Sequence, residues 1–216
     1  VEDRRHLGEK HEAAYCLDLL REIGVVTTDI SLELPRDPAA ERWADDIWAH
    51  ELQGRPFLAI HPAASCATRC WPVPAFAALI DLLKDSGLKI VLVGVGEAVL
   101  LAAQIRALTQ VPVLDMTRKT SLSQMVSLFR RARAVVSNDS GPVHVAAAAG
   151  TPVISIFLRS QPGINPGRWK PLGPQSRVVV PPEGRAIVVD RHSHIISGSF
   201  DAITPEQVFS AIREVI

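Results

Sequence analysis

Residues 137–157, SNDSGPVHVAAAAGTPVISIF, join a small apolar strand to an alanine-rich helix and then, through Gly-Thr-Pro, to a second apolar strand. The turn between strand and helix carries Asp139, Ser140, Gly141 and, three residues further on, His144. A strand, a helix and a strand in this order predict a parallel pair with a right-handed crossover. Open α/β sheets bind ligands where strands end, so this turn is the first candidate site.

The same alternation continues in both directions along the chain. We expect strands at 57–62, 89–96, 111–116, 134–138 and 152–157, with helices at 72–87, 97–109, 121–133 and 142–150. The strands are continuous apolar runs, which is typical of a parallel sheet covered on both faces. Residues 159–175 read as a loop, residues 176–180 as a possible strand, and residues 204–216 as a helix that begins at Thr204. The fold class expected is therefore α/β, a doubly wound, Rossmann-like parallel sheet.

The first quarter of the chain has a different pattern. Residues 10–23 have helical spacing, residues 27–38 are extended and proline-containing, and residues 39–52 form a second amphipathic helix with two tryptophans. This quarter lacks enough apolar residues for a core of its own. We therefore divide the chain into 1–54 (helix, linker and second helix) and 55–216 (the Rossmann-like domain).

Composition excludes several classes of function. The 216 residues include 23 Lys and Arg against 23 Asp and Glu, so no basic excess suggests a nucleic-acid partner. Three cysteines without a dense pattern argue against a disulfide framework and for a reducing compartment. The apolar windows are interrupted by Glu97 or by Gly-Thr-Pro, and the charged N-terminus does not resemble a secretory leader. We expect a soluble, cytoplasmic protein, and the initial Val hints at a fragment or a processed product.

The turn after residue 138 suits an anion. Free N–H groups and a partial positive charge lie at a helix start, Ser140 adds a donor, and Gly141 permits close approach. His144 would stay neutral beside that helix end and donate to a phosphate or sugar oxygen. Asp139 would either cap the helix or accept hydrogen bonds from sugar hydroxyls. In the simpler interpretation, Asp139 and Ser140 only cap the helix and His144 packs.

Two further loops lie at the same expected edge of the sheet. Arg69 is the cation of the first loop and would bind phosphate oxygens, unless it is a solvated surface group. The second loop, GVGEAVL at 94–100, lacks the third glycine of a dinucleotide fingerprint, so an NAD-dependent dehydrogenase is disfavoured. Glu97 would accept from ribose hydroxyls or complement the helix dipole. We expect Trp71 in the core and a structural hydrogen bond at His61.

No metal site is expected. Cys66 and Cys70 lie four residues apart without further ligands at a known spacing. His192 and His194 have no carboxylate or third histidine at a convincing spacing, which favours a surface segment.

Three stretches, 60–83, 89–97 and 121–157, resemble the nucleotide-sugar half of glycosyltransferase family 9, the ADP-heptose:lipopolysaccharide heptosyltransferases. The carrying elements are IHPAASCATRCW, KIVLVGVGE and NDSGPVHVAAAAGTP, and a looser likeness reaches the C-terminus. The resemblance implies a two-domain GT-B enzyme that inverts and needs no metal. It also implies that an N-terminal domain, missing from this chain, binds the acceptor and supplies the general base.

Position by position, the resemblance assigns the donor site. The diphosphate and the sugar would contact Asp139, Ser140, Gly141 and His144. The other residues assigned to the donor site are Ser65, Arg69, Glu97 and Thr120. Of these, Glu97 would lie at the ribose and Thr120 near the base. Arg69 stands where the family usually has Lys, which changes reach and geometry. The stretch FLRSQPGINPG at 157–167 replaces the Gly-Pro-Thr type of loop that is usual in the family, so the resemblance does not identify the donor sugar. Residues 10–24 would form the bridge out of the acceptor domain.

The resulting expectation is the donor-binding domain of a heptosyltransferase-like glycosyltransferase. ADP-heptose or a related ADP-sugar would be the donor, lipopolysaccharide core the acceptor, and Arg69 would stabilise the leaving group as its catalytic contribution. No cofactor and no nucleic acid are expected, and membrane association would be at most peripheral, at the inner membrane. The chain alone would bind nucleotide and turn over poorly. Two alternatives stay open: a non-catalytic nucleotide-sugar-binding module, and another GT-B-like enzyme such as a sugar-nucleotide epimerase.

Overall fold

The protein is built around one six-stranded parallel sheet. The structure, a computed structural model, describes residues 4–190 and 192–216. The sheet has the strand order β3-β2-β1-β4-β5-β6. Its strands are β1 (Phe57–His61), β2 (Lys89–Leu92), β3 (Val113–Asp115), β4 (Ala134–Asn138), β5 (Val153–Ile156) and β6 (Ser176–Val179). This order is that of a doubly wound Rossmann-like sheet, and it confirms the predicted fold class. The order reverses between β1 and β4, which is where such sheets bind ligands.

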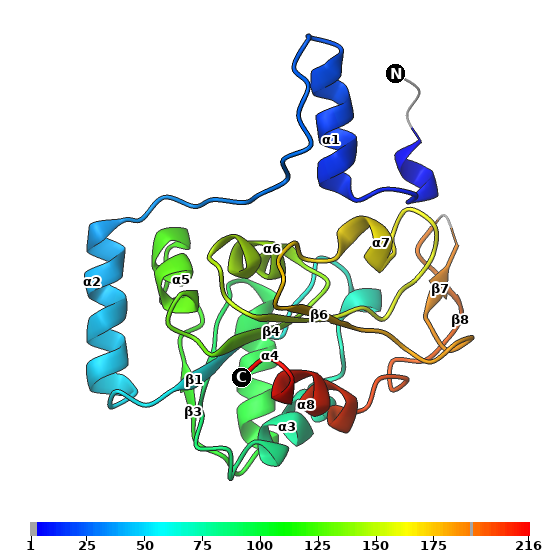
Figure 1. Ribbon diagram of the computed structural model, residues 1–216. Coiled ribbons are helices and arrows are strands. Elements are labelled where there is room, and N and C mark those ends of the chain that lie inside the picture. The colour runs from blue at the N-terminus through cyan, green and yellow to red at the C-terminus, as the bar shows by residue number, and fades with distance from the viewer. Residues whose placement is uncertain (1–3, 191) are drawn as a thin grey trace.

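Helices cover both faces of the sheet (Figure 1). One core cluster includes Phe76, Ile105 and Ile212, which come from α3 (Val73–Leu82), α4 (Glu97–Leu108) and α8 (Pro205–Arg213). The other includes Phe129 and Val143, from α5 (Leu122–Phe129) and α6 (Gly141–Ala148). The strand residues alternate between the two clusters, as the period of a β-strand requires: Leu58 and Ile60 face the first, Phe57 and Ala59 the second.

Helix starts follow the chemistry of their sequences. Ser121 caps α5 in a reciprocal capping box with Gln124, and Thr204 does the same for α8 with Gln207. Both cap positions agree with the predicted helix starts. At α6 the N-cap residue is Ser140, but its side chain makes no capping hydrogen bond.

The N-terminal segment contains a short turn, η1 (Arg5–Leu7), and two helices, α1 (Glu12–Arg21) and α2 (Pro38–Asp46). A π-helical turn, η2 (Ile47–Glu51), extends α2. Figure 1 shows α1 projecting from the body of the molecule, with an extended segment leading from it to α2 beside α5. The predicted helix exists, but its apolar residues are largely uncovered: Leu19 is 54% exposed, Ile23 just beyond α1 is 74% exposed, and Tyr15 is the buried residue of the helix.

The second helix joins the main core instead. Trp43 and Ile47 pack against the cluster that contains Phe129, and Leu52 is buried there. The first quarter thus borrows its core from the rest of the chain, as its composition suggested. The division between 1–54 and 55–216 stays a prediction.

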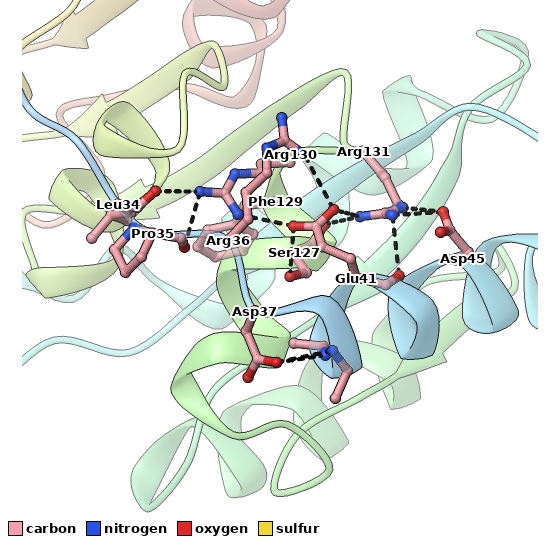
Figure 2. A network of polar contacts seen from close by, with 12 residues as sticks. Leu34, Pro35, Arg36, Asp37, Glu41, Asp45, Ser127, Phe129, Arg130 and Arg131 are labelled. Carbon is pink, nitrogen blue, oxygen red and sulfur yellow. Dashed lines mark hydrogen bonds and ion pairs between the residues drawn. The ribbon is translucent and has the colours of Figure 1, made fainter.

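A polar network attaches α2 and the linker to α5 (Figure 2). Glu41 accepts from Arg130 at 2.9 Å, from Arg131 at 3.0 Å and from Ser127 at 3.0 Å. Arg130 also donates to the Leu34 carbonyl at 2.8 Å. Burial raises the pKa of Glu41, but these hydrogen bonds outweigh it, so the pKa lies below its usual value. The end of the linker is therefore tied to the sheet domain by charge.

Two elements differ from the sequence interpretation. The stretch expected to be a loop contains a four-residue helix, α7 (Pro166–Trp169), whose N-cap Asn165 accepts from Arg168 N. Beyond it lies a short antiparallel hairpin of β7 (Val188–Val189) and β8 (Ile195–Ser197), which no pattern predicted. Within the described residues, no helix has the length and hydrophobicity needed to span a bilayer.

Candidate functional site

A cavity of about 330 Å³ opens at the carboxyl ends of β1, β2 and β4. Its lining combines the loops after these three strands: His61, Ala63, Ala64, Ser65, Arg69, Val95, Glu97, Ser140, Gly141 and Pro142. Five of the residues singled out in the sequence meet here, namely Ser65, Arg69, Glu97, Ser140 and Gly141. They come together because parallel strands end at the same edge of a sheet.

The start of α6 forms one wall of this cavity. Ser140 has an extended backbone, and its Oγ lies 3.0 Å from Ser137 Oγ rather than on a helix N–H. Neither Asp139 nor Ser140 caps the helix through its side chain, so the interpretation in which both only cap is wrong. A Cβ on Gly141 would meet no atom within 4 Å, so the backbone there borders open space. Pro142 has no N–H, and Val143 N donates to Ser140 O at 3.2 Å. The N–H groups at Ser140 and Gly141 are therefore the ones that an anion would use.

Arg69 is held in place from several sides. It is the last residue of a short turn, η3 (Ala67–Arg69). Its guanidinium donates to Ser65 Oγ at 2.6 Å, to Cys66 Sγ at 3.4 Å and to the Asp139 carboxylate at 3.4 Å. The alternative of a solvated surface arginine is therefore wrong. Burial alone would lower the pKa of Arg69. The hydrogen bond to Cys66 and the charge of Asp139 outweigh burial and raise this pKa above its ordinary value, so the group stays cationic.

Asp139 supports the site from behind. Its side chain is buried, and it does not line the cavity. Burial raises the pKa of Asp139, against the opposing effect of the nearby Arg69 charge. The carboxylate contacts Arg69 at 3.4 Å, and Arg69 in turn lines the cavity.

His61 lines the cavity at the end of β1. Its Nδ1 lies 3.3 Å from Ser137 Oγ, which in turn contacts Ser140 Oγ. Burial lowers the pKa of His61 from 6.5 to about 4, so the imidazole is neutral at pH 7. The predicted structural hydrogen bond exists, but no sequence pattern indicated that the ring also lines the cavity. Gly94 makes room for it, because a Cβ there would lie 2.9 Å from His61 Cδ2.

Besides Asp139, two further assigned residues, His144 and Thr120, lie outside this cavity. His144 is partly buried within α6, where burial and, to a lesser degree, the charge of His11 lower its pKa. Thr120 precedes the cap of α5 and is also no part of the lining. Their contacts with a donor stay predictions.

Two residues that sequence reasoning missed, Asn138 and Arg159, position the site. Asn138, fully buried at the end of β4, donates to the Pro62 carbonyl at 2.6 Å and accepts from Trp71 N at 2.9 Å. Arg159, directly after β5, donates to Thr68 Oγ1 at 3.3 Å and lies 3.8 Å from Cys66 Sγ. The only available signal was their place at strand ends of the predicted sheet. Trp71 is in the core as predicted, with Nε1 donating to Ile203 O at 2.9 Å.

Metal ligation finds no support in the described part of the chain, where no group of three His, Cys, Asp or Glu residues gathers. His192 and His194 are exposed, and His194 Nδ1 lies 3.1 Å from Asp190. Arg191 of this stretch, like residues 1–3, lies outside the described residues. The expectation of a metal-independent protein stays a prediction.

Fold and site together define a class: a doubly wound α/β domain whose switch-point cavity combines a fixed guanidinium, a helix N-terminus and hydroxyl groups, a set suited to phosphate oxygens. Comparison with known proteins agrees. The model of glycosyltransferase family 9 (heptosyltransferase) matches residues 10–195, so the chain belongs to this family.

Curated relatives carry heptosyltransferase names. Lipooligosaccharide heptosyltransferase 2 of Haemophilus ducreyi is 28% identical over 178 residues, which cover 76% of this chain and 49% of that protein. Lipopolysaccharide heptosyltransferase 2 of Escherichia coli is 32% identical over 132 residues, or 58% of this chain and 36% of that protein. The chain thus spans half or less of the length of these relatives.

Solved structures show the same fold. A glycosyl transferase family 9 protein from Veillonella parvula superposes with a TM-score of 0.81 at 19% identity, covering 95% of this chain and 60% of that one. E. coli ADP-heptose lps heptosyltransferase II has a TM-score of 0.68 at 23% identity, covering 88% and 55%. E. coli heptosyltransferase WaaC, solved with ADP, has a TM-score of 0.58 at 24% identity, covering 79% and 49%.

Proposed function

We propose that this chain is the donor-binding half of a heptosyltransferase-like glycosyltransferase, and that its cavity holds the diphosphate of an ADP-sugar. One observation carries the proposal: Arg69, fixed by Asp139 and Ser65, faces the same cavity as the start of α6. Membership of the family and the heptosyltransferase names of the relatives support this assignment.

The two sides of the cavity suit different parts of such a donor. Arg69 and the N–H groups at Ser140 and Gly141 offer positive charge to the diphosphate, and the Ser65 hydroxyl adds a donor. Glu97, in the first turn of α4, would repel phosphate and instead accept from ribose hydroxyls. Neutral His61 can donate a hydrogen bond to the ligand without adding charge.

The chemistry follows from where charge develops. An acceptor hydroxyl attacks the anomeric carbon, the bond from that carbon to the diphosphate oxygen breaks, and ADP leaves with inversion. Arg69 and the α6 amides stabilise the charge that grows on the leaving group, an effect worth roughly 3 kcal/mol for a single such donor in other enzymes. We place the general base and the lipopolysaccharide core acceptor on a separate acceptor domain. No metal takes part in this scheme.

The proposal also covers the cellular location and the partners of this protein. It works in the cytoplasm, at most peripherally attached to the inner membrane, and it has no nucleic-acid partner. By itself the chain binds the nucleotide and transfers sugar poorly.

Calorimetric titration with ADP, UDP and GDP tests the proposal. Wild-type protein should bind ADP, and Arg69→Ala should weaken binding at least tenfold, because a charge-assisted contact is worth about 1.5–3 kcal/mol. Ser140→Ala should have a smaller effect. Arg42→Ala, at an exposed position of α2 away from the cavity, is the matched control and should bind like wild type.

Absence of any nucleotide binding above the millimolar range would refute both a transferase and a binding module. Equal affinity in Arg69→Ala and wild type would refute the location of the diphosphate. Isomerisation of a UDP-sugar during incubation would instead identify an epimerase.

A further inference from the structure

Cys66 lies in an unusual polar environment beside the proposed donor cavity. It is partly exposed and immediately precedes η3. Its Sγ accepts from Arg69 Nε at 3.4 Å, lies 3.8 Å from Arg159 Nη1, and is 3.3 Å from Thr68 Oγ1. Two guanidinium groups and a hydroxyl therefore converge on one thiol.

If the Cys66 thiol is neutral, this cluster carries more positive than negative charge. The groups that face Cys66 are Arg69 from η3, Arg159 from the segment after β5, and Cys70 from the loop that follows; Asp139 lies behind Arg69. The carboxylate in contact with this pair of cations is Asp139, which pairs with Arg69; Glu97 of α4 lines the cavity with Arg69 and acts on Cys70 rather than on Cys66. A thiolate at Cys66 would supply the second anion.

Arg159 provides an independent observation. It is 9% exposed, and its Nε is a buried donor that meets no acceptor among residues 4–190 and 192–216. Its Nη1 donates to the Thr68 hydroxyl at 3.3 Å and lies 3.8 Å from the Cys66 sulfur. An incompletely paired buried cation is costly, and an adjacent anion lowers that cost. The arginine is therefore placed to favour the charged form of the sulfur.

The two cysteines of this loop differ in the direction of their pKa shifts. Burial raises the pKa of Cys66, but the hydrogen bond from Thr68 and the contacts with Arg69 and Arg159 outweigh it, so the pKa lies below its ordinary value. Burial raises the pKa of Cys70, and Arg69 offsets this only in part. The chain therefore offers Cys70 as an internal comparison, together with exposed Cys16 on α1.

We propose that Cys66 is a modification site: its sulfur exchanges with low-molecular-weight disulfides, and the adduct turns off nucleotide binding in the adjacent cavity. The Cys66 thiolate attacks one sulfur of the disulfide, a new S–S bond forms as the old one breaks, and the displaced sulfur leaves as a thiolate that takes a proton from solvent. The first half of this inference, the reactivity of Cys66, depends only on the polar cluster around the sulfur. The second half, the loss of nucleotide binding, rests on the proposed function.

The cavity is sensitive to such an adduct because Arg69 links the two. Its guanidinium contacts the Cys66 sulfur on one side and lines the cavity on the other. A mixed disulfide with glutathione removes the thiolate and places two peptide carboxylates beside Arg69. The guanidinium then has competing anionic partners and is no longer directed at a diphosphate.

Oxidised glutathione, followed by peptide mass spectrometry, tests the first half. Across pH 5–9 we expect Cys66 to form the mixed disulfide with a pH midpoint below that of Cys16, and to react about tenfold faster near pH 6. Arg159→Gln should raise the Cys66 midpoint and slow its reaction, whereas Arg42→Ala should leave both unchanged. A Cys66 midpoint equal to or above that of Cys16 in wild-type protein overturns the proposal, whether or not Arg159→Gln folds.

ADP titration of the same samples tests the second half. The Cys16→Ser/Cys70→Ser protein confines the adduct to Cys66. Its mixed disulfide should bind ADP at least tenfold more weakly than the reduced form, and dithiothreitol should restore binding. Equal affinity before and after modification refutes the regulatory role. If the reduced protein binds no ADP while Cys66 still reacts first, the proposed function fails and the modification site stands.

Discussion

At the scale of the residue, a single histidine connects the stability of the protein to pH. His61 ends β1, borders the cavity and contacts Ser137 from a largely desolvated position. Because burial lowers its pKa to about 4, the folded state disfavours its protonation. The unfolded chain, where the group has its ordinary pKa of 6.5, binds the proton more readily.

His61 should therefore destabilise the protein as the pH falls from about 6.5 to about 4. In this window the unfolded state binds more protons, so the free energy of unfolding decreases, by roughly 3 kcal/mol at the lower end. Urea unfolding of wild type and His61→Gln at pH 7 and pH 5 measures this. The stability difference between the two proteins should shift in favour of His61→Gln at pH 5. His50→Gln, at an exposed histidine, should follow wild type at both pH values.

Site residues that follow strand ends within a recognisable motif could be predicted from the sequence. Residues that reach the site from a distant part of the chain could not. Arg69, Ser140 and Gly141 follow strand ends in the sequence, and parallel geometry brings them to one cavity. Arg159 meets Cys66 across 93 residues of chain, and its loop carried no recognisable pattern. Asp139 was assigned to the donor, but it is buried against Arg69 and does not line the cavity, a position that local sequence does not show.

At the scale of the element, local capping chemistry determines where helices begin. The Ser121–Gln124 capping box satisfies two backbone donors at the start of α5, and the sequence predicted this start. By contrast, α7 depends on partners distant in the chain: Arg168 pairs with Glu12 at 2.6 Å. The hairpin of β7 and β8 has strands too short for a periodic signal. Elements held by tertiary contacts therefore escaped prediction.

Ser121→Ala should lower the free energy of unfolding by about 1 kcal/mol, because α5 loses a cap on a backbone N–H. Chemical denaturation measures the change. Ser123→Ala, an exposed position on the same helix, is the control and should be neutral or slightly stabilising, since alanine is the better helix former. Equal stabilities for the two variants would contradict a role for the cap.

At the scale of the whole molecule, charge rather than apolar burial attaches the linker to the sheet domain. Glu41 receives both Arg130 and Arg131, each less than 20% exposed at the side chain, and Arg130 also holds the Leu34 carbonyl. Apolar contacts of α2 with α5 complete the attachment. Further toward the N-terminus, α1 keeps a row of exposed apolar side chains.

Glu41→Gln should destabilise the protein by about 3 kcal/mol, because two partly buried arginines lose their shared carboxylate. Hydrogen exchange at residues 34–40 should rise more than exchange in β1, since the linker loses its attachment before the sheet opens. Glu51→Gln, on the exposed side of η2, should leave both quantities unchanged. Uniform acceleration of exchange across the sheet would contradict a local role for the network.

Asn138 has a consequence for how such a domain can diversify. One side-chain amide fixes both ends of the loop that starts at Pro62 and finishes at Trp71, and the cavity-lining residues Ser65 and Arg69 lie between these two anchors. Exchanges inside the loop can therefore alter ligand preference while the backbone keeps its course. An exchange at Asn138 would release both anchors together, so donor specificity is best re-engineered around this residue and never through it.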